Sequence, residues 1–341
     1  MSYSKQILAA LSLILLSGSY VHAASLKFAT MAPEGTDAML VLREIDKEVR
    51  AKTGGALSFK FYSGGRQGEE KDVVRKIRFG QLHGGGFTGV GLGEIAPEVR
   101  IVDAPWLFRD HDEVDYVYDK FAKDFEAAFE KKGYVLLGWT EVGFIHVFSN
   151  APVRSAKDMK NLKIWVWEGD PIAEAAFRAL GVNPIPLAVA DVNTSLQTGL
   201  IDSVYSAPYY AIALQWHEKT KYIYSVTMAN ASGAVLVSNK FFNKLPKSQQ
   251  DVLLSVSRAR LKGLNAKIRS ENEKALKTLE KQGLKITAPA SKEQTAFYDR
   301  AGKEARESLV GRLYSKEILN KVESALKDFR AGRPGKKSAS K

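Results

Sequence analysis

Strand and helix patterns alternate along the first part of the chain, and this order restricts the possible folds most strongly. Residues 25–30 place Leu26 and Phe28 on one face, which is typical of a strand. Apolar residues at helical spacing over 38–49 predict a helix, 57–61 alternates as a second strand, and 69–79 has a second helical pattern. Strand–helix–strand–helix order predicts an α/β fold with a largely parallel sheet.

A second βα series begins near Gly143 and suggests a second structural unit. Domains often contain roughly 150 residues, so a chain of 341 residues is long enough for two units, each with its own hydrophobic core. The further expected elements are a helix over 112–132, strands over 135–139, 144–148 and 163–167, a helix over 171–180, and a helix over 189–199 leading into a strand over 201–205.

A long charged helical pattern follows Leu245 and Pro246 and continues to Gly283. At about 1.5 Å per residue this helix would be roughly 50 Å long, more than the diameter of a small domain. Heptad spacing is not sustained, so the pattern favours a strut packed across two lobes over a coiled-coil arm.

The amino terminus has the three-part layout of a secretory signal peptide. Lys5 supplies the positive charge, residues 7–16 form the apolar run, and 21–23 end in small residues, which predicts cleavage after Ala23. The alternative interpretation of this apolar run is that it forms a first helix buried in the folded protein. The apolar run is shorter than the roughly 20 residues that span a bilayer, and no cysteine is available for a lipid anchor. We therefore expect a soluble exported protein.

Composition excludes several kinds of chemistry. The chain has no cysteine, so thiol nucleophiles, cysteine-ligated zinc, iron–sulfur clusters and disulfides are absent. It has 50 Lys and Arg against 38 Asp and Glu, a net charge of +12, and five of the positive residues lie in the last twelve positions. Such a tail is typical of a solvated flexible segment, and nucleic-acid binding is not indicated.

No motif indicates catalysis, a metal site or a cofactor. The run from Gly84 to Gly89 matches GxGxxG, but its expected surroundings do not fit a dinucleotide site. It could be a glycine-rich loop that lets backbone approach a ligand, or a tight loop at a strand end. The histidines are scattered, and no nucleophile motif occurs. Paired carboxylates such as Glu69 and Glu70 are expected to be solvated.

Aromatic residues gather in two segments. Trp165 and Trp167 are two apart in a predicted strand, so their side chains should face the same side. Tyr205, Tyr209 and Tyr210 lie around Pro208. These rings either pack a core or an interlobe surface, or line a ligand cavity.

Several segments together resemble one protein family. They are residues 26–29 (LKFA), 103–110 (DAPWLFRD), 160–164 (KNLKI), 179–184 (ALGVNP) and 195–202 (SLQTGLID), with LP at 245–246 and QQ at 249–250 as a weaker match. In this order they resemble the substrate-binding proteins of tripartite ATP-independent periplasmic (TRAP) transporters, of the DctP type.

The resemblance implies a two-lobe periplasmic-binding-protein-like α/β fold with a long helix spanning both lobes. The expected division is residues 1–23 as signal peptide, 24–142 with about 232–270 as lobe I, 143–231 with about 271–325 as lobe II, and 326–341 as a basic flexible tail. It further implies a periplasmic receptor without enzymatic activity. Such a receptor captures a small-molecule ligand, delivers it to TRAP membrane subunits and touches the inner membrane only through that transporter.

The departures from the family pattern concern the ligand. Where relatives read Lys-Ile-Arg-Val and Gly-Phe-Arg-His, this chain has Trp165 and Ile145 in place of the arginines, and Ser206 aligns with a frequent asparagine. A desolvated Arg–carboxylate pair is worth of order 2–5 kcal/mol, which neither residue supplies. A compensating Arg66 or Arg109 is the alternative.

We therefore predict a larger, neutral or mostly apolar ligand. The candidate ligand-binding residues are Thr88, Phe144, Ile145, Trp165, Trp167, Ser206, Tyr209 and Tyr210. The alternative function is a periplasmic carrier of a lipid-like molecule, or an exported enzyme on the same fold, without a TRAP membrane partner.

Overall fold

The structure is a computed structural model that describes residues 23–333. The predicted signal peptide, apart from Ala23, and the residues from 334 onward lie outside this range. The first half of the molecule is built on a five-stranded sheet of order β2-β1-β3-β10-β4. Its strands are β1 (Ala24–Thr30), β2 (Leu57–Tyr62), β3 (Gly84–Thr88), β4 (Tyr134–Phe144) and β10 (Asn230–Ser238).

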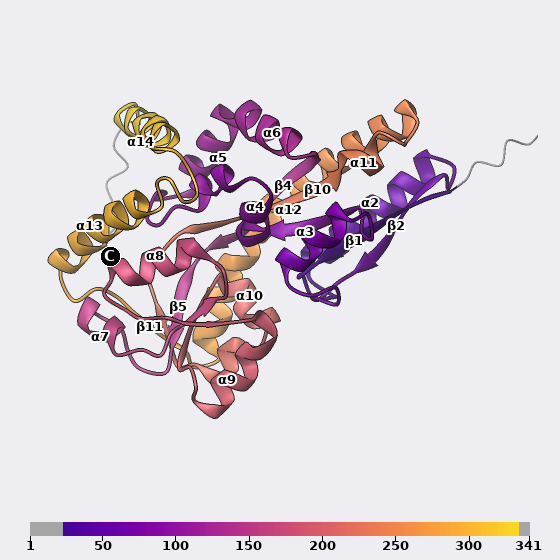
Figure 1. The fold of residues 1–341 in the computed structure, drawn as a ribbon. Helices are drawn as coiled ribbons and strands as arrows, with labels where there is room; N and C mark the ends of the chain where they lie inside the picture. Colours follow the sequence, from indigo (N-terminus) through magenta and orange to yellow (C-terminus); the bar gives the residue numbers. More distant parts are fainter. Residues whose placement is uncertain (1–22, 334–341) are drawn as a thin grey trace, which may run out of the picture.

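Helices cover both faces of this sheet (Figure 1). On one face lie α2 (Asp37–Lys52), α11 (Asn239–Phe242) and the first part of α12 (Lys247–Lys281). On the other lie α3 (Glu70–Arg78), α4 (Gly89–Ile95), η1 (Pro97–Asp103), α5 (His111–Lys120), α6 (Ala122–Lys131) and α14 (Lys316–Ala331). Alternate residues of each strand pack into the hydrophobic cores on the two faces of the sheet, because successive side chains of a strand point to opposite faces.

The second half contains a four-stranded sheet of order β11-β9-β5-β8 and the parallel pair β6-β7. The strands are β5 (His146–Ser149), β6 (Trp165–Trp167), β7 (Ile185–Leu187), β8 (Ser203–Ser206), β9 (Tyr222–Tyr224) and β11 (Lys285–Thr287). The helices are α7 (Ala156–Lys160), α8 (Pro171–Ala179), η2 (Val189–Asp191), α9 (Val192–Thr198), α10 (Pro208–Ala213), η3 (Trp216–Lys219) and α13 (Lys292–Ser308).

The prediction of a largely parallel sheet is confirmed for the first sheet, in which β1, β2, β3 and β4 run in one direction and β10 runs in the opposite one. β1 pairs in parallel with β2 and β3, but β10 is antiparallel to β3 and β4, and β5 is antiparallel to β8 and β9. The reversed direction of β10 was not predicted, because this strand returns from the second half and runs back along β4, a long-range pairing that no local pattern encodes.

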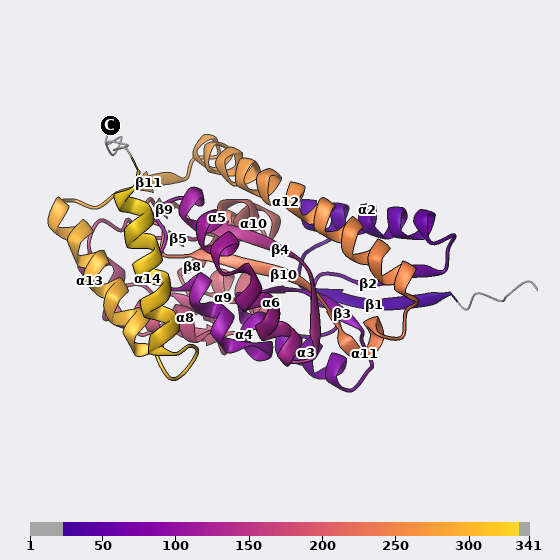
Figure 2. The ribbon, with the colours of Figure 1, turned by 90° about the horizontal axis from the view of Figure 1, so that it is seen from above.

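The long helix α12 contains 35 residues, as its sequence pattern predicts. It runs along the molecule from α2 toward β11 (Figure 2). Leu253 and Leu264 pack in the core of the first half, whereas Leu276 and Leu279 pack with side chains of the second half. One helix therefore contributes to both cores and acts as a strut.

Three local predictions need correction. The helix expected over 112–132 is two helices, because the chain leaves helical geometry at Phe121. The strand expected over 144–148 is interrupted at Ile145, so that β4 ends and β5 begins there. The run 84–89 is not a loop, since Gly84 to Gly86 lie within β3 and Gly89 begins α4.

The carboxy-terminal segment is more ordered than predicted. Where a flexible tail was expected from 326, α14 continues to Ala331, and Leu326 is buried against the first half. The guanidinium of Arg330 lies 2.7 Å from the carboxylate of Glu113, and Arg333 lies 2.8 Å from Asp110. Leu326 and its neighbours on α14 thus pack with the first half, whereas the prediction placed residues up to 325 with the second.

No helix within residues 23–333 combines the length and apolar character of a membrane span.

Candidate functional site

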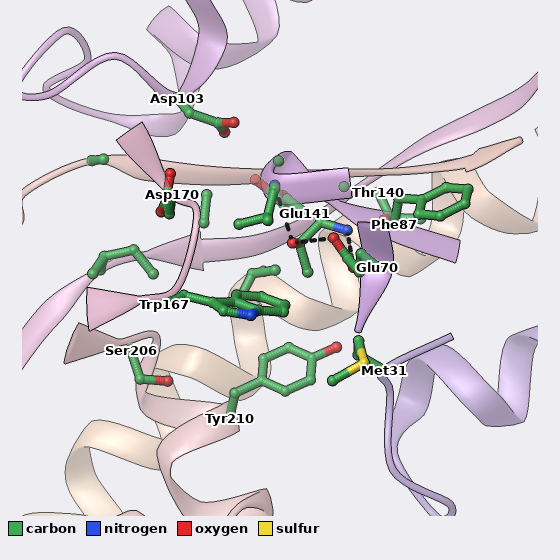
Figure 3. Close-up of a pocket in the computed structure, with 18 of the residues that line it drawn as sticks. Met31, Glu70, Phe87, Asp103, Thr140, Glu141, Trp167, Asp170, Ser206 and Tyr210 are labelled. Atoms are coloured by element: carbon green, nitrogen blue, oxygen red, sulfur yellow. Dashed lines mark hydrogen bonds between the residues drawn. The ribbon is translucent and has the colours of Figure 1, made fainter. Parts of the chain in front are cut away.

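A cavity of about 220 Å³ lies between the two halves, at the ends of β1 and β3 (Figure 3). β4 and β10 cross it, β6, β8, α8 and α10 line it from the second half, and α2 and α12 line it from the first. Its wall is strongly aromatic: Phe87, Trp165, Trp167, Phe177, Tyr205, Tyr210 and Trp216. Because the elements come from both halves, the cavity has the placement of a ligand site between lobes.

Six of the eight predicted ligand-binding residues line this cavity: Thr88, Ile145, Trp165, Trp167, Ser206 and Tyr210. Trp165 and Trp167 face the same side, as their spacing in β6 predicts. Trp165 is also a packing residue, because its ring stacks on Tyr205 at 5.0 Å and meets Trp216 edge-on at 5.0 Å. Its indole N–H donates to the Leu187 carbonyl at 3.0 Å. Contact with a ligand stays a prediction for all six.

Phe144 and Tyr209 do not line the cavity. Phe144 packs on the other side of its strand, with its ring 4.8 Å from that of His111, because adjacent residues of an extended chain point in opposite directions. Tyr209 and Tyr210 are neighbours on a helix of 3.6 residues per turn, so their side chains diverge. The Tyr209 hydroxyl accepts a hydrogen bond from the Asp37 backbone N–H at 3.0 Å.

Glu70 is buried beside the cavity, although we expected it to be solvated. Its carboxylate accepts hydrogen bonds from the Thr88 backbone N–H at 2.7 Å, from the Thr88 hydroxyl at 2.9 Å and from the Gly91 N–H at 2.6 Å. Figure 3 shows Glu70 among the residues that line the cavity. The Ser206 hydroxyl likewise donates to the carbonyl of Ala207 at 3.0 Å. Thr88 and Ser206, the two polar side chains predicted to contact the ligand through a hydroxyl at the end of a strand, are thus already hydrogen-bonded within the protein.

Burial raises the pKa of Glu70 from its ordinary 4.5 to about 7, because desolvation of the charge outweighs the three donated hydrogen bonds. Below pH 4.5 the group is protonated in both the folded and the unfolded chain. Between pH 4.5 and 7 the unfolded chain ionises while the folded chain stays protonated, so stability is lost as the pH rises.

We expect Glu70→Gln to remove this pH dependence. A pKa difference of one corresponds to about 1.4 kcal/mol, so Glu70 should lower the free energy of unfolding by up to about 3 kcal/mol over this interval. Urea unfolding of both proteins at several pH values measures their free energies of unfolding. The difference between the two proteins at each pH reports Glu70, because the contributions of the other titratable groups cancel. Equal slopes for both proteins would contradict the raised pKa.

Arg100 is the cationic side chain among the described cavity-lining residues. Its guanidinium is buried between Asp103, 2.7 Å from Nε, and Asp170, 2.9 Å from Nη2. Asp170 also accepts a hydrogen bond from the Tyr205 hydroxyl at 3.2 Å. Two carboxylates thus neutralise one guanidinium, and Glu70 and Glu141 add further acidic groups to the wall.

Glu69 joins the two halves at the rim of the cavity. Its carboxylate accepts a hydrogen bond from the Trp167 indole N–H at 2.7 Å and from the Val189 backbone N–H at 3.3 Å. Lys71 lies 3.8 Å from Glu168 next to this contact. The indole that lines the cavity is therefore held in place by the opposite half.

Glycines let the backbone of the wall pack closely. A Cβ atom on Gly89 would lie 2.0 Å from the Asp103 carboxylate, and one on Gly233 would lie 2.4 Å from the Thr140 hydroxyl. One on Gly84 would lie 2.6 Å from the Leu236 carbonyl oxygen. Close packing, and not a phosphate-binding loop, thus accounts for the glycine-rich run.

Sequence reasoning missed Arg100, Glu69 and Glu70. The sequence does carry a signal for Arg100, because a single charge inside the apolar run 99–102 indicates a buried, paired residue. No local pattern distinguishes Glu69 and Glu70 from ordinary surface acids. The two arginines considered as replacements, Arg66 and Arg109, are exposed and do not line the cavity.

The family model DctP, described as bacterial extracellular solute-binding protein, family 7, matches residues 28–310. The chain belongs to this family. The resemblance to TRAP-type substrate-binding proteins is thus confirmed.

Curated relatives cover most of the chain. It is 25% identical over 296 residues to the 2,3-diketo-L-gulonate-binding periplasmic protein YiaO of Escherichia coli (strain K12), covering 86% of this chain and 89% of YiaO. It is 23% identical to the C4-dicarboxylate-binding periplasmic protein DctP of Rhodobacter capsulatus, covering 80% of this chain and 83% of the relative.

A solved structure supports the architecture. The TRAP periplasmic solute binding protein from Desulfovibrio salexigens, with bound orotic acid, superposes with a TM-score of 0.82 at 20% identity, covering 89% of this chain and 99% of that chain. The predicted two-lobe fold is confirmed. The DctP family consists of periplasmic solute receptors, so this chain is a receptor and not an enzyme.

Proposed function

We propose that this receptor captures a neutral or largely apolar ligand between its lobes and delivers it to TRAP-type membrane subunits. The observation that carries the proposal is the charge balance of the cavity. Among the described lining residues, the cationic group Arg100 is paired with both Asp103 and Asp170. Glu141 is paired with Arg269, and the raised pKa of about 7 keeps Glu70 protonated at lower pH, so no cationic group of the described lining is left for a ligand carboxylate.

A ligand carboxylate would find poor surroundings in this cavity. The Arg100 guanidinium is already shared by two aspartates, so it offers little net positive potential. Juxtaposed like charges cost several kcal/mol at a desolvated interface. The named relatives bind 2,3-diketo-L-gulonate and C4-dicarboxylates, and the solved relative holds orotic acid. The present chain is therefore proposed to differ from them in ligand charge.

The aromatic wall supports an apolar ligand. Trp165 and Trp167 stand where the family pattern has a cation and a neighbouring residue, and Tyr210 lines the same space. Aromatic side chains provide large apolar contact surfaces. Ile145 replaces the second arginine of the pattern and also lines the cavity. The ligand is thus proposed to be held mainly by burial of apolar surface.

Calorimetry with matched ligand pairs tests the charge of the ligand. Each pair has one carbon skeleton and differs only in its head group, such as hexan-1-ol and hexanoate. We expect the alcohol to bind at least about tenfold more tightly than the carboxylate, since tenfold corresponds to only 1.4 kcal/mol. Tighter binding of the carboxylates, or stabilisation by succinate or orotate, would refute a neutral ligand. Native mass spectrometry of the freshly purified receptor independently measures the mass of any ligand that is purified together with it.

A further inference from the structure

The cavity has two ends of different character. At the acidic end lie Glu70, Asp103, Glu141 and Asp170. At the opposite end, which we call the apolar arm, six aliphatic side chains line the cavity: Ala38, Leu42, Val235, Leu261, Leu264 and Ile268. No charged residue of the described lining belongs to α2, α12 or β10, the three elements that form the arm.

The two ends lie toward opposite faces of the first sheet. The arm residues belong to the core between the sheet and helices α2 and α12. Asp103 ends η1 and Glu70 begins α3, and both of these elements pack on the other face. Because β1 and β3 end at Thr30 and Thr88, the cavity passes their ends from one face to the other.

The acidic end contains a buried carboxylate oxygen without a hydrogen-bond partner among the described residues. Glu141 is only 4% exposed, and Arg269 donates to its Oε1. Its Oε2 is buried and has no hydrogen-bond partner among the described residues. A buried carboxylate oxygen favours a hydrogen-bond donor as its neighbour. A ligand group that donates a hydrogen bond and carries no negative charge meets this requirement.

We infer that the ligand is an amphiphile, with an alkyl or similar apolar part in the arm and a hydrogen-bond-donating head at the acidic end. This inference rests on the proposed function and adds the shape and polarity of the ligand. The apolar part lies between α2 and α12, where Leu42, Leu261 and Leu264 surround it. The head lies near Glu141 on the other face of the sheet.

A homologous series of primary alcohols from butanol to decanol tests the arm by calorimetry on the purified protein. Burying one methylene is worth about 0.8 kcal/mol, so we expect affinity to rise about fourfold per carbon until the arm is filled. Affinity that does not depend on chain length would overturn the amphiphile.

Two substitutions on one helix provide a matched comparison. Ala38→Leu adds bulk inside the arm, whereas Ala51→Leu adds the same bulk at an exposed position of α2. We expect Ala38→Leu to stop the rise in affinity at a shorter chain and Ala51→Leu to leave the series unchanged. Leu42→Ala enlarges the arm and should move the limit to a longer chain, which keeps a readout if Ala38→Leu fails to fold. Identical series in all variants would overturn the assignment of the arm.

Carboxylates of the same chain lengths separate this inference from the proposed function. If alkanoates bind more tightly than alkanols but Ala38→Leu still shortens the series, the neutral ligand is refuted and the arm stands. If alkanols bind more tightly without any dependence on chain length, the arm is refuted and the proposed function stands. If no alkanol binds, both are refuted.

Discussion

Replacing Arg100 by methionine is expected to lower the free energy of unfolding by about 3–5 kcal/mol, the usual cost of leaving buried charges without their partner. The guanidinium side chain is 4% exposed, and the carboxylates of Asp103 and Asp170 are almost as deeply buried. Methionine keeps most of the side-chain volume, so the loss reports the uncompensated acids and not a cavity.

Urea unfolding of Arg100→Met and of a matched surface variant measures this effect. Arg43 forms an exposed pair with Glu34, so Arg43→Met should cost less than about 1 kcal/mol. Adding Asp103→Asn and Asp170→Asn to Arg100→Met should recover part of the loss, because the buried charges are then removed together. Equal losses for the two arginine variants would show that the Arg100 triad is not a stabilising unit.

Replacing Trp165 by alanine is expected to cost about 3–5 kcal/mol of unfolding free energy and to abolish ligand binding. The ring is 2% exposed and packs between Tyr205 and Trp216. Alanine removes both ring contacts and leaves the Leu187 carbonyl without its indole donor. Loss of binding follows because the same ring lines the cavity.

Two control variants make this result specific. Trp165→Phe retains an aromatic ring but loses the indole N–H, so its cost should be about 1–3 kcal/mol, as for an unsatisfied buried acceptor. Phe79 is 74% exposed, and Phe79→Ala should change stability by no more than about 0.5 kcal/mol. Calorimetry with the alcohol series completes the comparison. Normal binding by a folded Trp165→Ala protein would remove this residue from the site.

Local periodicity was sufficient to predict most elements of this fold. The alternation in β1 and the helical spacing of α2 are encoded in a few adjacent residues, and the length of α12 is encoded in one uninterrupted helical pattern of 35 residues. The antiparallel course of β10 could not be predicted in the same way, because its partners in β4 lie about ninety residues earlier in the chain. Phe121, at the break between α5 and α6, packs against the core of the first half, a tertiary contact that helix propensity does not encode.

The positions of site residues could be predicted where the direction of a side chain follows from the geometry of a single strand or helix. The shared orientation of Trp165 and Trp167 needs only the two-residue repeat of a strand. The role of Glu69 depends on an indole 98 positions away, and the burial of Arg100 depends on Asp170, 70 positions away. Such contacts exist only in the folded chain, which is why sequence reasoning expected Glu69 to be solvated.

The glycine-rich wall has a consequence for how new specificities arise in this receptor. Gly89 and Gly233 leave no room for a methyl group, so substitutions there would be selected against whatever the solute. Helices α2 and α12 meet the cavity with aliphatic side chains, such as Ala38 and Leu42, that a substitution can enlarge or shorten without placing a side chain on Gly89 or Gly233. Natural divergence, or laboratory evolution of a biosensor from this scaffold, should therefore accumulate its changes on the two helices and conserve the glycines.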